Sequence, residues 1–502
     1  MERTKWENRF VLLRFWKKNY MMFLKDLKRF KMERLYDKLK AYSESDFYAF
    51  HMPGHKRNKT LLGIELPYDL DITEIDGFDD LHHADGILKE EQERAARVFG
   101  AEESHFLVNG STAGILSAVM GCTHRGDKIL VARHCHKSIY HAIYMNGLVP
   151  RYVYPEFDIS MHMNGEISKE DVAKALAAEP DIKAVVIVSP NYDGVVSDVK
   201  GIAEVAHSYR IPLIVDEAHG PHFGFHPAFP GRANDLGADV VINSLHKTLP
   251  SLTQTAILHI NGKLANRRRI KKYLDMLQSS SPSYIFMASL DACVDFLDGK
   301  CEEAFELYVE RLQKFREELK PLQHLQILRT EHYDISKVVI STANANITSP
   351  ELADRLRKEY HLEMEMTGGT YVLAMTTVAD TQEGLNRLKA ALLEIDDQLE
   401  AKTAVSGSIE ISGELPRLEQ YFTPQEAAER EEDGEAEEIP WKESEGHISL
   451  EYAYLYPPGS PVIVPGERIS REAVELLCYY ETQNLQIEGI QTEGKIKVWK
   501  HE

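Results

Sequence analysis

The chain contains a lysine and an aspartate that could share one reactive site. Lys247 ends the string Ser244-Leu-His-Lys, directly after the largely apolar run 238–243. Asp216 ends another apolar run, 211–215, upstream of the lysine. A neutral lysine amine held beside an aldehyde can form an imine with it, and a carboxylate can keep a pyridine nitrogen protonated. The pair therefore predicts a site for pyridoxal 5'-phosphate (PLP), with Lys247 on the aldehyde and Asp216 on the ring nitrogen.

A small-residue string upstream could bind the phosphate of this cofactor. Asn109-Gly-Ser-Thr-Ala-Gly114 stands where a predicted strand turns into a predicted helix. Unpaired N–H groups at a helix start attract anions, and the hydroxyls of Ser111 and Thr112 add hydrogen-bond donors. By itself the string also fits an ordinary helix cap with a glycine turn. Its place before the aspartate and the lysine favours phosphate, with Ser244 and His246 as further contacts.

Two histidines stand near the ends of predicted strands. His136 follows the predicted strand 128–131, and its imidazole could stack on the pyridine ring and take part in proton transfer. The alternative is a histidine in a surface loop. His219 lies three residues after the aspartate and could reach the ring oxygen or the substrate. The string Asp-Glu-Ala-His also suggests a helicase, but the chain has no G-x-x-x-x-G-K-[ST] phosphate loop.

Several histidines raise the question of a metal site. His51 and His55 flank Pro53-Gly54, which breaks a helix, so the two rings cannot face one ion as a helical pair. We therefore expect no metal.

The segments around these residues alternate between strand-like and helical patterns. Helical patterns cover 86–99, 111–120 and 199–209. Short apolar runs predict seven strands, at 105–108, 128–131, 151–154, 184–188, 212–215, 239–242 and 255–258. Because strands buried on both faces are apolar throughout, this pattern predicts a mainly parallel sheet covered by helices.

The remainder of the chain predicts further units. Residues 335–400 indicate a smaller α/β unit with helices at 349–360 and 381–399. The acidic stretch 426–438 is expected to be a solvated helix or loop at a boundary, and a last helix spans 470–482. We predict four parts: a basic N-terminal extension at 1–44, a large PLP-binding domain at 45–300, a small α/β domain at 301–410 and an α+β region at 411–502.

Bulk composition excludes several classes of protein. The net charge of −21 over 502 residues argues against a nucleic-acid binder, and no apolar run is long enough to span a bilayer. Five cysteines without C-x-x-C spacing fit a reducing cytoplasm. Residues 1–40 hold 13 Lys/Arg against 5 Asp/Glu, which fits either an amphipathic helix for a membrane or partner, or a solvated extension before a later start codon. We favour the extension and expect no membrane association.

Six strings together resemble the Orn/Lys/Arg decarboxylase family of fold-type I PLP enzymes. They are Phe50-His-Met-Pro-Gly-His-Lys56, Asp71-Ile-Thr-Glu-Ile-Asp-Gly-Phe-Asp-Asp-Leu-His82, His136-Lys-Ser138, Asp216-Glu-Ala-His-Gly220, Ser244-Leu-His-Lys247 and Ser281-Pro-Ser-Tyr-Ile-Phe-Met-Ala-Ser-Leu-Asp291. The resemblance covers about residues 45 to 300 and resumes from Tyr456 to Glu467. It implies the aspartate aminotransferase fold. The chain is similar to the shorter bacterial branch, because no receiver-like domain precedes the His-x-Pro-Gly-His motif.

The resemblance also implies roles for individual residues. Lys247 is the expected Schiff-base lysine, Asp216 the partner of the pyridinium and His136 the stacking residue. The expected phosphate contacts are Ser111, Thr112, Ser244 and His246. The family's active site lies at a dimer interface, so we expect a homodimer or larger homo-oligomer in which the segment from Ser281 reaches the partner's cofactor.

The implied reaction is decarboxylation of a basic amino acid in polyamine metabolism. Arginine is the first choice, with lysine and ornithine as alternatives. Lys247 or His136 would supply the proton at Cα, and carboxylates would recognise the substrate's cationic end. The candidates are Glu467, Asp79 and Asp80, which could equally be ordinary surface acids. An aminotransferase on the same fold, a non-catalytic decarboxylase-like binding protein and a membrane role of residues 1–40 remain open alternatives.

Overall fold

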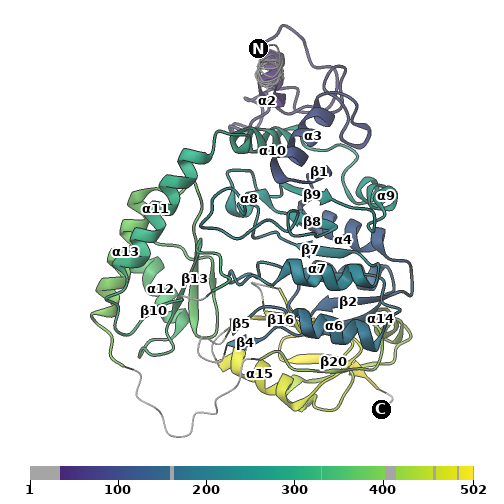
Figure 1. The fold of residues 1–502 in the computed structure, drawn as a ribbon, viewed down its shortest axis with the longest axis vertical. Helices are drawn as coiled ribbons and strands as arrows, with labels where there is room; N and C mark the ends of the chain where they lie inside the picture. Colours follow the sequence, from purple (N-terminus) through teal and green to yellow (C-terminus); the bar gives the residue numbers. More distant parts are fainter. Residues whose placement is uncertain are drawn as a thin grey trace, which may run out of the picture.

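A seven-stranded sheet forms the centre of the fold. The computed structural model describes residues 34–158, 163–328, 331–401, 414–455, 459–482 and 485–500. The strand order in the sheet is β1 (Glu103–Leu107), β9 (Ala256–Ile260), β8 (Val240–Asn243), β7 (Leu213–Asp216), β6 (Val185–Val188), β2 (Lys128–Ala132) and β3 (Val149–Val153). β9 runs antiparallel to both neighbours, and the other adjacent strands pair in parallel (Figure 1). All seven predicted strands are present, which confirms the mainly parallel sheet.

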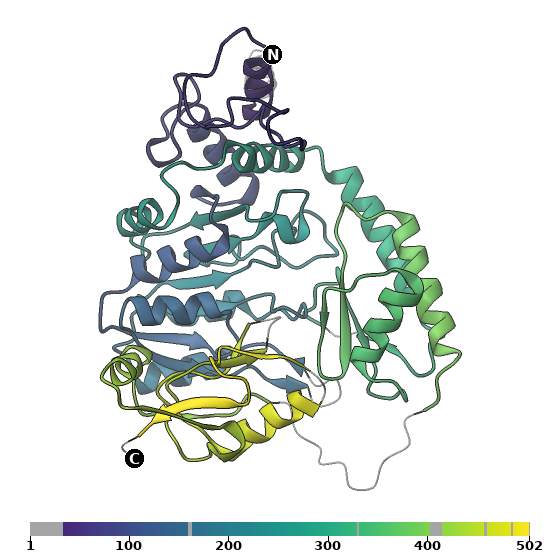
Figure 2. The same ribbon diagram turned by 180° about the vertical axis from the view of Figure 1, so that it is seen from behind.

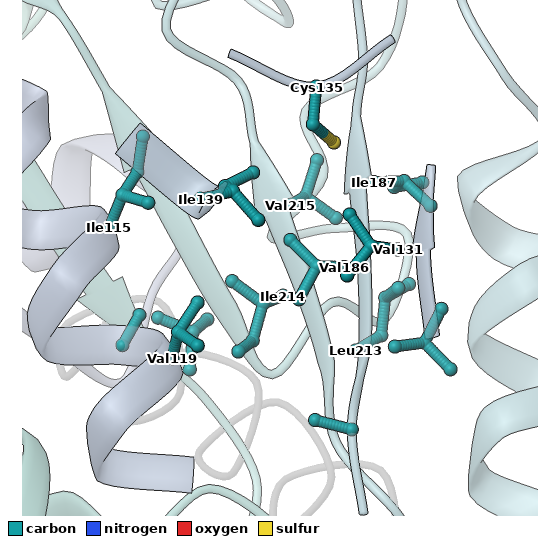
Figure 3. Close-up of a cluster of buried hydrophobic side chains, with 14 of the residues drawn as sticks. Ile115, Val119, Val131, Cys135, Ile139, Val186, Ile187, Leu213, Ile214 and Val215 are labelled. Carbon is teal, nitrogen blue, oxygen red and sulfur yellow. The ribbon is translucent and has the colours of Figure 1, made fainter. Parts of the chain in front are cut away.

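Helices cover both faces of this sheet. Every residue of β6, β7 and β8 is buried, and successive strand residues point to opposite faces, so neither face is open to water. α4 (Gly110–Cys122) lies over β7, β8 and β9 and packs against α5 (Lys137–Met145) and α9 (Arg267–Leu277). α6 (Lys169–Ala178) and α7 (Val199–Ser208) pack together near β3 and β7. Figure 3 shows Ile115 and Val119 of α4 beside the strands that carry Val186 and Ile214.

The small unit, residues 302–396, lies beside the large sheet (Figures 1 and 2). Its antiparallel sheet has the order β10 (Gln326–Ile327), β11 (Lys337–Ser341), β13 (Tyr371–Met375) and β12 (Met366–Thr367). The helices are α11 (Glu302–Glu318), α12 (Ser349–Tyr360) and α13 (Gln382–Asp396). α12 confirms the predicted helix 349–360, because Thr348 and Glu351 form a capping box at its start.

The C-terminal unit, residues 414–500, corrects one prediction. It contains β14 (Glu419–Gln420), α14 (Pro424–Glu432), β15 (Ala436–Pro440), η2 (Trp441–Glu443), β16 (Ala453–Leu455), β17 (Pro461–Ile463), β18 (Glu467–Arg468), α15 (Arg471–Thr482), β19 (Ile487–Glu488) and β20 (Lys495–Trp499). The acidic stretch 426–438 is helical at first but then enters β15, so the expected solvated helix or loop is wrong there. β15 pairs with β20, sixty residues downstream, which local composition could not reveal.

Residues 34–44 of the basic segment include a helix that packs on the large unit by one face and exposes the other. α2 (Leu35–Ser43) lies on α10 (Tyr284–Leu297) and buries Leu35 and Leu39 completely. The expected solvated extension is therefore wrong for one face of this helix, on which two leucines one helical turn apart are buried beside α10. Residues 1–33, with the candidate amphipathic helix, lie outside the described residues.

Four further elements or pairs complete the described part of the fold. They are η1 (Leu81–His83), α3 (Ile87–Phe99), α8 (Leu245–Thr248) and the antiparallel pair β4 (Phe157–Asp158) and β5 (Met163–Asn164). Within the described residues, every helix is too short or too polar to cross a bilayer.

A buried cluster of charges joins α2, α3 and α10. The Arg94 guanidinium contacts the carboxyl groups of Glu91 and Asp291, and it lies 3.3 Å from Asp295. Asp291 also accepts a hydrogen bond of 3.1 Å from the Leu35 backbone N–H. Burial raises the pKa of Glu91 well above its ordinary value, and the nearby Asp291 carboxylate adds to this effect. Glu91 is therefore the acid of this cluster that keeps its proton at neutral pH.

Replacing Glu91 with Gln should remove a pH dependence of stability. Folded Glu91 holds its proton more tightly than the unfolded chain does, so the free energy of unfolding declines as pH rises above the ordinary glutamate pKa. Urea unfolding of Glu91→Gln should show a flatter decline between about pH 6 and about pH 9. Asp291→Ala, which strips the buried Arg94 of a partner, should cost about 3–5 kcal/mol. If the free energy of unfolding of Glu91→Gln declined with pH as steeply as that of the wild type, Glu91 would not be the protonated acid of the cluster.

Candidate active site

The predicted site residues gather at one edge of the large sheet. β1, β2, β7 and β8 run in the same direction, so their carboxyl ends reach the same edge. β1 leads into α4, β2 leads into α5, β7 ends at Asp216, and β8 leads through Ser244 into α8. The sheet topology therefore brings together residues that are more than a hundred positions apart.

Lys247 has a partly buried amine at the centre of this edge. Its Nζ lies 2.8 Å from Nε2 of His219. Burial lowers the pKa of Lys247, and the charges of Asp216 and Glu365 act against this shift without reversing it. Because the ammonium form is disfavoured, a larger fraction of Lys247 is the neutral amine, and the neutral amine is the form that acts as a nucleophile.

Asp216 is buried, and its carboxylate charge interacts with the charge of Lys247. One carboxylate oxygen accepts a hydrogen bond of 3.1 Å from the Ala218 backbone N–H. Burial raises the pKa of Asp216, and the Lys247 charge opposes this. A further cation at this carboxylate would stabilise it, which is what a protonated pyridine nitrogen supplies.

His136 is held in one tautomer at the start of α5. Its Nδ1 accepts a hydrogen bond of 3.2 Å from the Ser138 backbone N–H, so the neutral ring carries its proton on Nε2. Burial and then the Lys247 charge lower the pKa of His136 to about 4. The ring is therefore neutral at physiological pH and lies within the electrostatic reach of the lysine.

The start of α4 is open to an anion. The Asn109 side chain accepts from the Ser279 backbone N–H at 3.1 Å, and in the described part of the chain it makes no cap for α4. Ser111 and Thr112 stand in the first turn, with Thr112 exposed. Gly110 has φ +73°, a conformation that favours glycine, and the space where a Cβ would stand is empty.

Ser244 and His246 differ in how well they suit a phosphate. The Ser244 hydroxyl is buried and has no hydrogen-bond partner among the described residues, so it is ready to donate to an oxyanion. His246 donates through Nδ1 to the Thr255 carbonyl at 2.8 Å. Its Nε2 can therefore donate to phosphate only if the ring is protonated.

These features fit PLP. The unpartnered Ser244 hydroxyl and the uncapped start of α4 suit the phosphate, and the buried Asp216 suits the ring nitrogen. The disfavoured ammonium of Lys247 suits the aldehyde.

The structure adds three residues that sequence reasoning missed. Lys337, the first residue of β11, is fully buried, and its Nζ lies 3.0 Å from Nδ1 of His219. The Tyr192 ring lies 4.5 Å from the His219 ring, and the Tyr192 hydroxyl donates to Glu365. The only sequence signal was a lysine at the start of a buried strand, which is unusual because lysines are rarely fully buried.

His219 connects Lys337 of the small unit to Lys247 of α8, and a second histidine, His222, makes a similar connection beside it. His222 Nδ1 lies 3.0 Å from the Thr248 hydroxyl, and its Nε2 lies 3.1 Å from Asp334. His219 and His222 are three residues apart in the sequence, and so are Asp334 and Lys337. The small unit is thus joined to α8 at two neighbouring residues, one of which is Lys247.

The carboxylates expected to bind substrate are occupied elsewhere in this chain. Asp79 accepts from four backbone N–H groups, those of Asp80, Asp85, Gly86 and Leu88. Asp80 accepts from the His82 N–H at 2.9 Å. Among the described residues, the carboxylates whose charges act on Lys247 are Asp216 and Glu365.

Glu467 forms a buried clamp with Arg133. The Arg133 guanidinium donates to Glu467 at 3.0 Å and to the carbonyls of Pro461 and Val462 at 2.8 and 3.0 Å. The Lys137 N–H donates to the Gly459 carbonyl at 3.1 Å. The C-terminal unit therefore holds the segment 133–137 on both sides of His136.

Breaking the clamp should be costly. Glu467→Ala leaves a fully buried guanidinium without its carboxylate, and the expected loss of stability is about 3–5 kcal/mol. Urea unfolding measures it, and Glu419→Ala, an exposed acid in the same unit, serves as the control. A loss below about 1 kcal/mol, the level of a surface pair, would contradict the clamp.

Comparisons with known proteins identify the family of this chain. The family models described as Orn/Lys/Arg decarboxylase, major domain, and Orn/Lys/Arg decarboxylase, C-terminal domain, match residues 33–345 and 413–494. An arginine decarboxylase of Bacillus subtilis (strain 168) is 33% identical, with 91% of this chain and 95% of that protein covered. An arginine decarboxylase of Bacillus anthracis is 32% identical, with coverage of 93% and 97%.

A solved structure confirms the expected fold class. The lysine decarboxylase LdcF of Francisella novicida superposes with a TM-score of 0.79 at 20% identity, over 96% of this chain and 83% of that one. Family models and relatives that span most of the chain show that this protein belongs to the Orn/Lys/Arg decarboxylase family.

Proposed function

We propose that the protein uses PLP to remove the α-carboxylate of a basic amino acid, with arginine as the preferred substrate. The observation that carries this is the partly buried Lys247 amine, opposite Asp216 and beside His219, at the strand edge. The choice of arginine rests on relatives named arginine decarboxylase. The product would be a polyamine precursor. We also propose a cytoplasmic location, where the five cysteines, all free, would stay reduced.

The chain's own residues divide the work of holding the cofactor. Asp216 would face the ring nitrogen, Lys247 the aldehyde and His136 one face of the ring. The start of α4, with Ser111 and Thr112, and the Ser244 hydroxyl would face the phosphate, and His246 would join them only when protonated. When bound, PLP supplies an electron-withdrawing ring that accepts the electron pair left at Cα by the departing CO₂.

Proton delivery at Cα can come from two side chains. The Lys247 amine contacts His219 Nε2 at 2.8 Å and can exchange a proton with that ring. His136 is neutral and presents Nε2–H, because Ser138 occupies its Nδ1. Burial lowers the pKa of both groups, so the protonated form of either one is a stronger acid than in water and gives up its proton more readily, returning to the neutral side chain.

The cationic end of the substrate needs a carboxylate, and we propose Glu365. This residue is exposed, comes from the small unit, and acts electrostatically on both Lys247 and Lys337. The Tyr192 hydroxyl donates to it and so orients it. A planar guanidinium can bind a carboxylate through two hydrogen bonds, which favours arginine.

We also propose that the active protein is a homodimer or a larger homo-oligomer. The segment 47–66 exposes a row of large apolar side chains, and Phe50 is 89% exposed. The other members are Phe47, Tyr48, Met52, Leu61, Leu62, Ile64 and Leu66. A second copy would cover this surface, since apolar area of this kind favours association. The segment from Ser281 would then face the partner's site.

The central test is product identification. Purified protein with PLP and each of arginine, lysine and ornithine should release CO₂ and the matching amine, fastest with arginine. Lys247→Ala should lose turnover to the detection limit, because it removes the nucleophile. Lys263→Ala, an exposed lysine nearby in sequence, should keep it. Consumption of a keto acid without CO₂ would point to an aminotransferase, and no amine from any substrate would refute the proposal.

The role of Glu365 has its own test. Glu365→Gln keeps the size and removes the charge, so KM for arginine should rise about ten- to hundredfold, matching the roughly 1.5–3 kcal/mol of a hydrogen bond to a charged group. The rate constant kcat should change much less. Glu363→Gln, an exposed glutamate two residues away, is the matched control. An unchanged KM in Glu365→Gln would rule out this contact.

A further inference from the structure

The His219 ring stands between two lysine amines. Nε2 lies 2.8 Å from Nζ of Lys247, and Nδ1 lies 3.0 Å from Nζ of Lys337. His219 is buried, and burial, followed by the two lysine charges, keeps its pKa well below the ordinary value. The ring is therefore neutral, with one nitrogen that donates and one that accepts.

This arrangement restricts the protonation of the lysines. An ammonium group has three donors and no acceptor, so it can bind only the accepting nitrogen of a neutral imidazole. The other nitrogen carries a proton and needs an acceptor, which a lysine provides only as a neutral amine. Two ammonium groups would leave one N–H facing a cation inside the protein. Hence one of Lys247 and Lys337 is neutral.

The surrounding charges favour Lys337 as the protonated member. Burial lowers the pKa of Lys337 to about 8, and the carboxylates of Asp334, Glu365 and Asp193 act against this shift, so the ammonium form still predominates at neutral pH. Burial lowers the pKa of Lys247 as well, and two carboxylates, Asp216 and Glu365, act against this shift. Lys337 therefore has one more counter-charge than Lys247.

Lys337 is fixed in place by its neighbours. Its backbone carbonyl accepts from the Tyr333 hydroxyl at 2.8 Å and from Arg316 at 2.7 Å. Gly194 has φ +106°, and a Cβ there would come within 2.7 Å of Lys337 Cγ, so the close approach of the lysine side chain requires glycine. The parallel contact from Asp334 through His222 to Thr248 keeps the small unit in register with α8.

We propose that Lys337 is a positioning residue that acts on Lys247 through His219. The Lys337 ammonium donates to Nδ1, which places the ring proton on Nε2, and this N–H donates to Lys247 and holds its amine in the neutral, nucleophilic form. The effect on catalysis rests on the proposed function. The protonation states of Lys337, His219 and Lys247 depend only on the residues of this chain.

Other titratable groups face the same three residues and must be considered with them. They are Asp216 at the end of β7, His136 before α5, His246 in α8, Asp193 after β6, Asp334 before β11 and Glu365 before β12. The carboxylates favour protonated lysines, so the effect of Lys337 on Lys247 is isolated by substituting Lys337 and comparing the variant with the wild type.

The reactivity of Lys247 tests the proposal directly. The full chain, freed of cofactor with hydroxylamine, is methylated by formaldehyde and cyanoborohydride from about pH 6 to about pH 10, and the rate at Lys247 is read by peptide mass spectrometry. The pH at which a lysine reacts reports its neutral fraction, and one pKa unit is tenfold in rate below the midpoint. In Lys337→Met, the rate at Lys247 near pH 7.5 should fall about tenfold or more.

Controls separate this effect from loss of structure. Tyr333→Phe removes a contact to the Lys337 carbonyl and leaves every charge in place, so the pH profile of Lys247 should not move. The exposed Lys263 in the same samples serves as an internal standard. If Lys337→Met does not fold, Lys337→Gln removes the same charge and keeps a polar side chain in the buried space, and the same fall is expected.

An unchanged pH profile of Lys247 in the folded variant would overturn the proposal. A merely structural Lys337 would shift the unfolding midpoint and leave the reactivity of Lys247 as it was. The measurement needs no turnover. A chain that makes no amine but shows the shift would therefore refute the proposed function alone.

Discussion

The burial of a primary amine is the constraint on which the rest of this structure depends. An ammonium ion away from water is costly, so Lys247 must either find counter-charges or lose its proton. The fold supplies two carboxylates, Asp216 at the end of a neighbouring strand and Glu365 from the small unit, and a neutral imidazole, His219, in hydrogen-bond contact. This balance leaves the amine reactive. Strands that end at a common edge are what allow such groups to meet without long loops.

Buried polar contacts join the three parts of the chain at this edge. The small unit reaches α8 through two histidines, from Lys337 to Lys247 and from Asp334 to Thr248. The C-terminal unit grips the segment before α5 through Arg133. Losing one partner of any of these contacts would leave a buried polar or charged group without a hydrogen bond, which costs free energy. The three parts of the chain therefore favour one relative arrangement. Side chains that serve stability and side chains placed for chemistry are therefore the same or adjacent ones.

The sequence predicted the positions of some candidate site residues and not those of others, and the difference has a physical reason. Lys247, Asp216, His136 and Ser111 follow apolar runs, so their place at strand ends could be inferred from local pattern. Lys337 and Glu365 had no such signal, because their role comes from packing between units. Asp79 and Glu467 were expected near substrate, yet one accepts four backbone N–H groups and the other pairs with a buried arginine. A carboxylate's partners cannot be read from its neighbours in sequence.

The sequence by itself determined the fold class, the order of the seven strands along the chain and the strand-end chemistry. Each depends on short-range features: apolar runs, helix starts and the residues directly after them. Only the tertiary structure decided that residues 34–44 pack on α10, that β15 pairs with β20, and that His219 lies between two lysines. Those facts depend on contacts between distant segments, where burial sets both the partners and the protonation of each group. The hydrogen-bond partners of a buried polar group come from distant segments of the chain, so they cannot be predicted from the residues next to it in the sequence.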